Sequence, residues 1–246
     1  MKRNHFLKLL CIGGLLVSLF SLNSFTFLQD MFNRNQLIGK GNSDIIGDSY
    51  TSKMHKDAKT AFLKMKKEAA KEGINIEVVS AYRSFQRQKE IFERKYKKFT
   101  SQGLSPSEAI NKIIEYSTIP GTSRHHWGTD IDIIDANVPR PSSVLKAKNF
   151  HGDGPFCKLK EWLDIHSEEF GFFEVYTNNP NRKGFKYEPW HFSYAPVSKP
   201  MLQEYKKLNI KAILKEENIL GNEYFTEEFI QKYKNQNILD INPELL

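Results

Sequence analysis

The stretch that decides the fold is Pro120-Gly-Thr-Ser-Arg-His-His-Trp-Gly-Thr-Asp-Ile-Asp-Ile133. Its last part, from Thr129 to Ile133, alternates polar and apolar residues, which is typical of a strand with one buried face. Asp130 and Asp132 are therefore expected on one face of this strand, and the isoleucines on the other. Gly128 lets the chain turn just before the strand begins. The pattern predicts a turn that leads directly into a half-buried strand.

A histidine in the turn, His125, can approach the carboxylate of Asp132, and Glu188-Pro-Trp-His191 adds a second histidine and another acid. A catalytic zinc ion takes three protein ligands and leaves its fourth position to water. His125, Asp132 and His191 fit such a ligand set, and Glu188 is left to accept a proton from water. Each of these residues also has an ordinary interpretation as a packed histidine or a solvated acid. Spacing alone leaves both interpretations open.

Three separated motifs carry a resemblance: Ser80-Ala-Tyr-Arg83-Ser, then Ser123-x-His125-x-x-Gly128-x-x-x-Asp132, then Glu188-Pro-Trp-His191. In this order they resemble the zinc D-alanyl-D-alanine carboxypeptidases. That family includes the D,D-carboxypeptidases of vancomycin resistance and is related to lysostaphin-type peptidases and the hedgehog signalling domain. The resemblance covers residues 55–200. It implies an α+β fold, in which a small antiparallel sheet carries the zinc site and helices flank the sheet.

The resemblance also implies a role for each site residue. His125, Asp132 and His191 are expected to bind Zn²⁺, with Glu188 as the general base. Arg83 is expected to stabilise the polarised carbonyl oxygen of the substrate. The remaining residues expected to bind substrate, or to support those that do, are Gln88, Ser123, Tyr82, Trp190 and Asp130.

Two positions depart from the pattern of the relatives: Ala81 stands where they usually carry glycine, and Asp130 stands where many carry alanine. Asp130 can hydrogen-bond a ligand, bind a substrate amine or compete for the metal, and the motif register favours Asp132 as the ligand. The ligand histidines are each expected to donate their second ring N–H to an acceptor, either Asp130 or a backbone carbonyl. His126 matches no required position and is expected to be packed or exposed.

The N-terminus resembles an export segment. Lys2, Arg3 and Lys8 precede an uncharged apolar run from Leu9 to Leu22. Residues 1–28 are predicted to be a signal peptide or an uncleaved membrane anchor, and both alternatives stay open. Either one places the catalytic part in the cell envelope, outside the cytoplasm.

The rest of the chain divides into three predicted parts: a polar linker at 29–52, a zinc D,D-carboxypeptidase-like catalytic domain at 53–200 and a C-terminal helical extension at 201–246. The extension is expected either to pack on the domain or to contact a partner. With 246 residues, 39% hydrophobic, the chain is long and apolar enough for one well-packed domain. Only Cys157 lies beyond the leader, so no internal disulfide is expected.

The hydrophobic periodicity predicts helices and strands within these parts. Helices are expected at 55–72, 85–99, 105–116, 156–170, 201–215 and 226–232, and strands at 74–80, 129–133, 172–176 and from Phe185 onward. The loop at 136–154 is expected to border a cleft.

The net charge of +7 is compatible with nucleic acid or with anionic polymers of the cell wall. No nucleic-acid motif is present and the leader directs the chain out of the cytoplasm, so nucleic acid is excluded as a partner.

The predicted activity is removal of the terminal D-alanine from peptidoglycan stem peptides. Alternatives on the same zinc site are an L,D-carboxypeptidase, a peptidoglycan endopeptidase or a non-enzymatic wall-binding module. Oligomeric state is left open.

Overall fold

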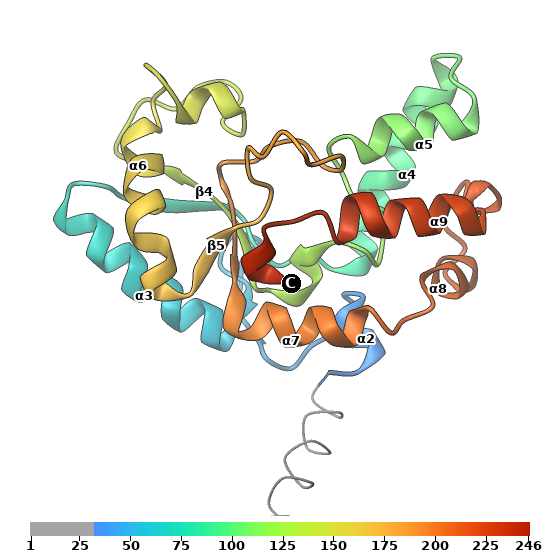
Figure 1. Ribbon diagram of the computed structural model, residues 1–246, viewed down its shortest axis with the longest axis horizontal. Coiled ribbons are helices and arrows are strands. Elements are labelled where there is room, and N and C mark those ends of the chain that lie inside the picture. Colours follow the sequence, from blue (N-terminus) through green and yellow to red (C-terminus); the bar gives the residue numbers. More distant parts are fainter. Residues whose placement is uncertain (1–31) are drawn as a thin grey trace, which may run out of the picture. The chain divides into compact units, whose positions relative to one another are not determined.

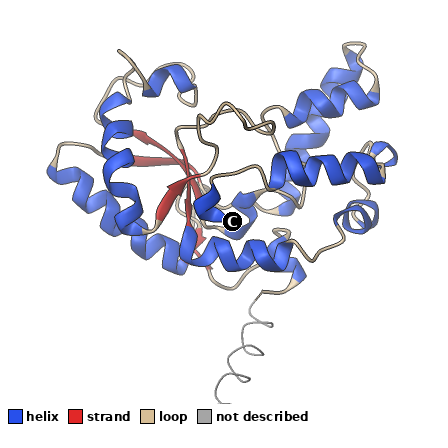
Figure 2. Cartoon of the chain, viewed as in Figure 1, coloured by secondary structure: helices blue, strands red, loops and turns tan. Residues whose placement is uncertain are grey.

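An antiparallel four-stranded sheet with the strand order β3-β4-β6-β5 forms the centre of the fold. Its strands are β3 (Ile76–Ser80), β4 (Asp130–Asp135), β5 (Phe172–Glu174) and β6 (His191–Tyr194). In this computed structural model, which describes residues 32–246, the sheet lies between helices on both sides (Figures 1 and 2). The predicted α+β fold is confirmed. The predicted leader at 1–28 lies outside the described residues.

One face of the sheet packs into the main hydrophobic core. Ile131 and Ile133 of β4 are fully buried there, together with side chains of α3 (Lys56–Lys71) and α6 (Cys157–His166). Burying a large aliphatic side chain contributes about 1.5–3 kcal/mol, so the alternation along β4 is strongly specified. The opposite face of β4 is left to carry Asp130 and Asp132, as the alternation predicts.

A tight turn delivers His125 to this polar face. The short 3₁₀ helix η1 (Arg124–Trp127) ends at Gly128, which has a φ of 72°. A β-carbon at this position would lie 2.3 Å from Ile45 Cδ1. Glycine is therefore required at Gly128 both for its left-handed backbone and for the close approach of Ile45.

Two helices, α4 (Phe85–Ser101) and α5 (Pro106–Ile114), pack against each other on the other side of the sheet (Figure 1). Helix α5 begins with a capping box, in which Ser105 and Glu108 each bond the other's backbone N–H. The predicted helices at 55–72, 85–99 and 105–116 are confirmed to within a few residues at their ends. Helix α6 is shorter than predicted, because its last turn continues as the 3₁₀ helix η3 (Ser167–Phe170).

The polar linker predicted at 29–52 is wrong for residues 34–52. This segment forms α2 (Arg34–Leu37) and the strand β1 (Ile45–Ile46), which pairs with β2 (Met54–His55). Leu37 and Ile38 are buried, and the Trp127 side chain donates a hydrogen bond to the Leu37 carbonyl at 3.0 Å. Two apolar residues within a polar stretch are enough to anchor it to the domain.

The strand predicted from Phe185 onward is also wrong, because regular pairing begins only at His191. The Glu188 N–H donates to the Tyr176 carbonyl and the His191 N–H donates to the Glu188 carbonyl, both at 3.0 Å. Pro189 lacks an N–H and so favours this turn over a strand. Residues 185–190 therefore form an irregular segment that brings Glu188 to the end of β6.

The C-terminal helical extension packs on the domain, one of the two alternatives left open by the sequence. The single helix predicted at 201–215 is wrong: α7 (Ala195–Tyr205) and α8 (Ile210–Glu216) are separate, and Asn209 caps α8 by accepting from the Ala212 N–H. The predicted boundary at residue 200 falls inside α7. The helix predicted at 226–232 is confirmed as α9 (Glu227–Tyr233).

The remaining helical turns are short. They are η2 (Ala147–Phe150) in the long loop after β4, η4 (Asn222–Tyr224), the π-helical turn η5 (Lys234–Ile238) and η6 (Pro243–Leu245). No helix within residues 32–246 has both the length and the apolar character that crossing a lipid bilayer requires.

Candidate metal centre

Three side chains from separate segments meet on the polar face of the sheet. Candidate ligand atoms of His125, Asp132 and His191 all lie within 4.8 Å of one another. His125 Nε2 is 3.4 Å from one Asp132 carboxylate oxygen, and His191 Nδ1 is 3.7 Å from the other. The strands β4 and β6 set this arrangement directly, because Asp132 and His191 are partners in their antiparallel register.

The second ring nitrogen of each histidine is held by an acceptor. His125 Nδ1 donates to the Ala81 carbonyl at 2.8 Å, and His191 Nε2 donates to Asp130 at 3.0 Å. These are the two kinds of acceptor that the sequence predicts. They fix the orientation of each ring, and they leave His125 Nε2 and His191 Nδ1 directed at Asp132.

The donor set fits a divalent cation. Oδ1 of Asp132 is buried and has no hydrogen-bond partner within the part of the chain that the structure describes. Burial raises the pKa of Asp132 to about 6, and the neighbouring Glu188 carboxylate acts in the same direction. A buried carboxylate oxygen without a partner is costly, whereas a bound cation would satisfy it. Two imidazoles and one carboxylate are a common ligand set for catalytic Zn²⁺.

The two histidines have opposite pKa shifts. Burial lowers the pKa of His125 well below its usual value, with Arg83 and His191 adding to the effect, so its Nε2 is an unprotonated ligand at neutral pH. Burial also lowers the pKa of His191, but hydrogen bonds to Asp130 and Glu188 outweigh it and raise the pKa to about 10. Metal binding at His191 Nδ1 must therefore displace a proton.

A buried ionic network contacts His191 through its Nε2 atom. Asp130 is fully buried and accepts hydrogen bonds from Arg124 Nε at 2.9 Å, from Thr129 at 2.8 Å and from Ser193 at 2.6 Å. The Arg124 guanidinium also donates to Ser193 at 2.8 Å. Arg124 and the histidines hold the pKa of Asp130 below its usual value despite its burial, so its carboxylate stays charged.

The proposed general base lies beside the ligands. Oε2 of Glu188 is 2.9 Å from His191 Nδ1, the nitrogen that is directed at the ligand cluster. Tyr176 packs edge-on against the His191 ring, with ring centroids 5.0 Å apart. Glu188 is thus within reach of a proton released at the metal position.

Arg83 is aimed at the same region from the junction of β3 and α4. Its guanidinium donates to the Gln88 side-chain oxygen at 3.0 Å and to the Ser80 hydroxyl at 3.1 Å. Gln88 is itself fixed, because its amide nitrogen donates to the Thr118 carbonyl at 2.7 Å. Nε of Arg83 is buried and has no partner among the described residues.

These residues open into a cavity with a volume of about 770 Å³. Arg83, Ser123, Glu188 and all three ligand residues line it, with Trp190 and Tyr176 among its aromatic walls. The ligands are only 4–5% exposed and form its floor. Residues 145–147, within the long loop after β4, also line it, as the sequence predicts for that loop.

Three of the residues expected to bind substrate, or to support those that do, do not line the cavity. Tyr82 does not line the cavity, since its hydroxyl donates to the Gly39 carbonyl at 3.3 Å and its ring lines a separate surface pocket. Gln88 is fully buried and supports Arg83, which is the supporting role among the two that the resemblance implies for it. Asp130 is also fully buried and accepts a hydrogen bond from the candidate ligand His191, the first of the three roles that the sequence left open for it. The predictions for Ser123 and Trp190 are compatible with their position on the wall.

His126 is packed, one of the two alternatives that the sequence left open. It is fully buried, donates to the Arg83 carbonyl at 2.6 Å, and accepts from the Gly121 N–H at 3.1 Å. Burial lowers its pKa to about 4, so it is neutral. It ties the backbone that precedes α4 to the turn that precedes His125.

Sequence reasoning did not find several residues around the site, namely Arg124, Ser193, Tyr176, Lys146 and Lys186. Arg124 and Ser193 adjoin motif positions, which is the only signal that could have found them. Lys146 and Lys186 lie in loops whose paths depend on tertiary packing.

Comparison with known proteins agrees with the site. Residues 51–197 match the family described as VanY, D-alanyl-D-alanine carboxypeptidase. This chain belongs to the VanY family. The resemblance inferred from the three motifs is therefore confirmed, and the His–Asp–His cluster lies within the matched region. The protein is a zinc-dependent peptidase of the D-alanyl-D-alanine carboxypeptidase class.

Two curated relatives match parts of the chain. An uncharacterized protein of Haemophilus influenzae is 36% identical over 105 residues, which are 42% of this chain and 80% of the relative. A D-alanyl-D-alanine carboxypeptidase of Enterococcus faecalis is 28% identical over 130 residues, which are 52% of this chain but only 43% of the relative. The chain thus spans less than half the length of the enterococcal carboxypeptidase.

A solved structure, VanYB in complex with D-Alanine-D-Alanine, shares the fold. It superposes with a TM-score of 0.50 at 21% identity, over 72% of this chain and 90% of that one. The arrangement of sheet and helices is thus shared with this VanYB structure.

Proposed function

We propose that the protein is a zinc D,D-carboxypeptidase of the cell envelope that removes the terminal D-alanine from peptidoglycan stem peptides. The observation that carries the proposal is the meeting of His125, Asp132 and His191 within 4.8 Å, with Glu188 beside them at the floor of a cavity. The enterococcal relative is a D-alanyl-D-alanine carboxypeptidase, which supports this choice of substrate.

The chemistry divides between the metal and the protein. Zn²⁺ held by the two imidazoles and Asp132 would act as a Lewis acid and make water acidic enough to be deprotonated near neutral pH. Glu188 accepts the proton of the attacking water and returns it to the leaving amine of D-alanine. The Asp130 hydrogen bond keeps the His191 ring in the orientation that this reaction needs.

Arg83 opposes the charge that develops on the carbonyl oxygen. Ser80 and Gln88 hold its guanidinium before substrate arrives, so little reorganisation is needed in the transition state. One such preorganised donor is worth about 3–4 kcal/mol in transition-state stabilisation.

The cellular location is part of the proposal. The apolar run from Leu9 to Leu22 after a basic start supports export, and peptidoglycan is assembled outside the cytoplasmic membrane. The net charge of +7 also suits an environment of anionic wall polymers. A fusion to a reporter that is active only after export tests the location.

The activity is tested by incubating the zinc-loaded protein with a stem pentapeptide that ends in D-Ala-D-Ala. One equivalent of D-alanine and a tetrapeptide are expected. Glu188→Gln should lower kcat by about 10²–10⁴-fold, with bound zinc unchanged. Release of a dipeptide, cleavage of a tetrapeptide or cutting of a crosslink would instead support the endopeptidase or L,D-carboxypeptidase alternatives. Full hydrolysis by Glu188→Gln would contradict the role of Glu188.

A further inference from the structure

Two lysines at the entrance of the cavity have no role in the proposed chemistry. Lys146 and Lys186 line the cavity from two different segments, the start of the η2 turn and the irregular segment before β6. Both side chains are exposed, whereas the metal ligands at the floor are buried. The lysines therefore lie at the rim, away from the reacting bond.

Neither lysine is neutralised by a neighbouring acid. Within residues 32–246, the Lys146 and Lys186 ammonium groups form no ion pair or side-chain hydrogen bond. Lys160, by contrast, pairs with Asp164 and with Glu174. Two unpaired ammonium groups beside a cavity can bind an anionic group of a ligand without first breaking an internal ion pair.

The charge balance of the cavity favours the same kind of ligand. The described residues that line it include three cationic side chains, Arg83 and the two lysines, but only two carboxylates, Asp132 and Glu188. Both carboxylates lie at the metal position, where a divalent cation would balance them. The rim is thus positive, and a low-dielectric cleft concentrates this potential.

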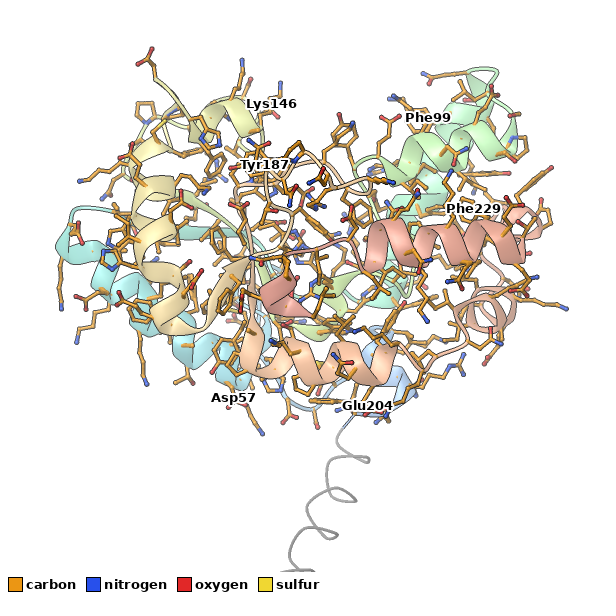
Figure 3. All side chains as sticks on the ribbon, viewed as in Figure 1. Asp57, Phe99, Lys146, Tyr187, Glu204 and Phe229 are labelled. Carbon is orange, nitrogen blue, oxygen red and sulfur yellow. The ribbon has the colours of Figure 1, made fainter. Side chains whose placement is uncertain are left out.

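A direct contact holds the two lysine-bearing segments together. His151, just after η2, is hydrogen-bonded to the Tyr187 hydroxyl at 2.9 Å, and their rings stack with centroids 5.6 Å apart. Figure 3 shows Lys146 and Tyr187 in the same upper part of the molecule. The contact fixes Lys186, the neighbour of Tyr187, relative to the η2 turn.

We infer that Lys146 and Lys186 form a subsite for a free carboxylate of the peptide substrate, located on the N-terminal side of the scissile bond. The inference rests on the proposed carboxypeptidase activity. A carboxypeptidase releases only the C-terminal residue of its substrate. The residues on the N-terminal side of the scissile bond therefore extend from the metal position towards the rim. The preferred substrate is thus an acidic peptide, and its amidated counterpart is disfavoured. An exposed ion pair of this kind changes kcat/KM by about 2- to 5-fold for each lysine, and salt weakens the effect.

The test compares two synthetic stem pentapeptides that both end in D-Ala-D-Ala. They differ only in the carboxyl groups that precede the terminal dipeptide, which are free in one peptide and amidated in the other. For the zinc-loaded protein, kcat/KM should favour the acidic peptide by about 5- to 20-fold at low salt. The double variant Lys146→Gln, Lys186→Gln should bring this ratio close to one.

A matched control removes the same charge nearby. Lys148 and Lys183 are exposed lysines close in sequence to the pair, but they do not line the cavity. The double variant Lys148→Gln, Lys183→Gln should keep the preference of the wild type. Equal kcat/KM for the two peptides in the wild type, or an unchanged ratio in Lys146→Gln, Lys186→Gln, would overturn the inference.

A binding measurement separates failure of the subsite from failure of the proposed activity. If the wild type releases D-alanine from neither peptide, the proposed activity is wrong. The subsite is then decided by calorimetry with zinc-loaded Glu188→Gln. Tighter binding of the acidic peptide, lost in the lysine double variant, supports the subsite. Equal affinities for both peptides refute it.

Discussion

Hydrogen bonds stabilise both the metal centre and the C-terminal helical extension (201–246), but they hold different groups in the two regions. At the metal centre, the bonds hold side chains: Ala81 and Asp130 orient the two ligand histidines, and Gln88 orients Arg83. In the extension, they hold backbone. Tyr233 accepts from the Ile119 N–H at 3.2 Å, just before the motif that begins at Ser123.

The extension also braces the segment before Glu188. Asp240 accepts hydrogen bonds from the backbone N–H groups of Lys183 and Gly184, at 2.6 Å and 2.9 Å. The match to the VanY family ends at residue 197, yet the extension contacts the approaches to both ligand motifs. Changes at the metal centre should therefore alter metal binding or catalysis, whereas changes in the extension should alter mainly stability.

The largest effect is expected from His125→Ala. Loss of one of three ligands should abolish stoichiometric zinc binding and reduce D-alanine release to background, as measured by metal analysis and product assay. His166→Ala, which removes a partly exposed histidine of α6, is the control and should retain both. A His125→Ala protein with full zinc content would show that the ligand set is wrong.

Arg83→Ala should come next. Removal of the preorganised donor should lower kcat by about 10²–10³-fold, while zinc content stays at that of the wild type. Arg87→Ala is the matched control in α4, the helix that follows Arg83, since Arg87 is exposed and, within residues 32–246, its side chain pairs only with Glu90. A change in KM without a change in kcat would mean that Arg83 binds substrate instead of stabilising the transition state.

Asp130→Ala should have an intermediate effect. Removal of the acceptor of His191 Nε2 should weaken zinc affinity by about 10- to 100-fold, as measured by competition with a chromogenic chelator. Asp135→Ala, at the other end of β4, is the control because, among the described residues, the Asp135 side chain bonds only the backbone N–H groups of Asn75 and Asn137. If both variants lose the same zinc affinity, general destabilisation of the strand is the cause.

The smallest effect is expected from Tyr233→Phe. The Ile119 N–H loses its acceptor and the Thr122 hydroxyl loses a partner, which should cost about 1–3 kcal/mol in the free energy of unfolding. Thermal unfolding should shift down by a few degrees, with zinc affinity unchanged. Tyr224→Phe, at an exposed tyrosine of the same extension, should leave the midpoint unchanged. A loss of zinc affinity in Tyr233→Phe would show that the extension positions the ligands as well.

The elements that sequence patterns predicted correctly are those with strong local signals. The Thr129–Ile133 alternation gave the correct strand face, and the Ser105 capping box gave the correct start of α5. The predictions were wrong where the local sequence pattern was weak and tertiary contacts decided the structure. Leu37 and Ile38 anchor a stretch whose composition is that of a linker, and Pro189 interrupts an aromatic run that otherwise favours a strand.

The residue types and order of the three motifs by themselves determined which family the chain resembles and predicted a metal ligand set, a base and an arginine, since those chemistries need particular side chains. Only the tertiary structure decided what each one faces. The strand register pairs Asp130 with Ser193, where it is buried outside the cavity and bonded to His191, and the packing of Gly39 on the β3–α4 junction directed Tyr82 elsewhere. The physical reason is that a side chain's role depends on its burial and partners, which segments distant in the sequence supply.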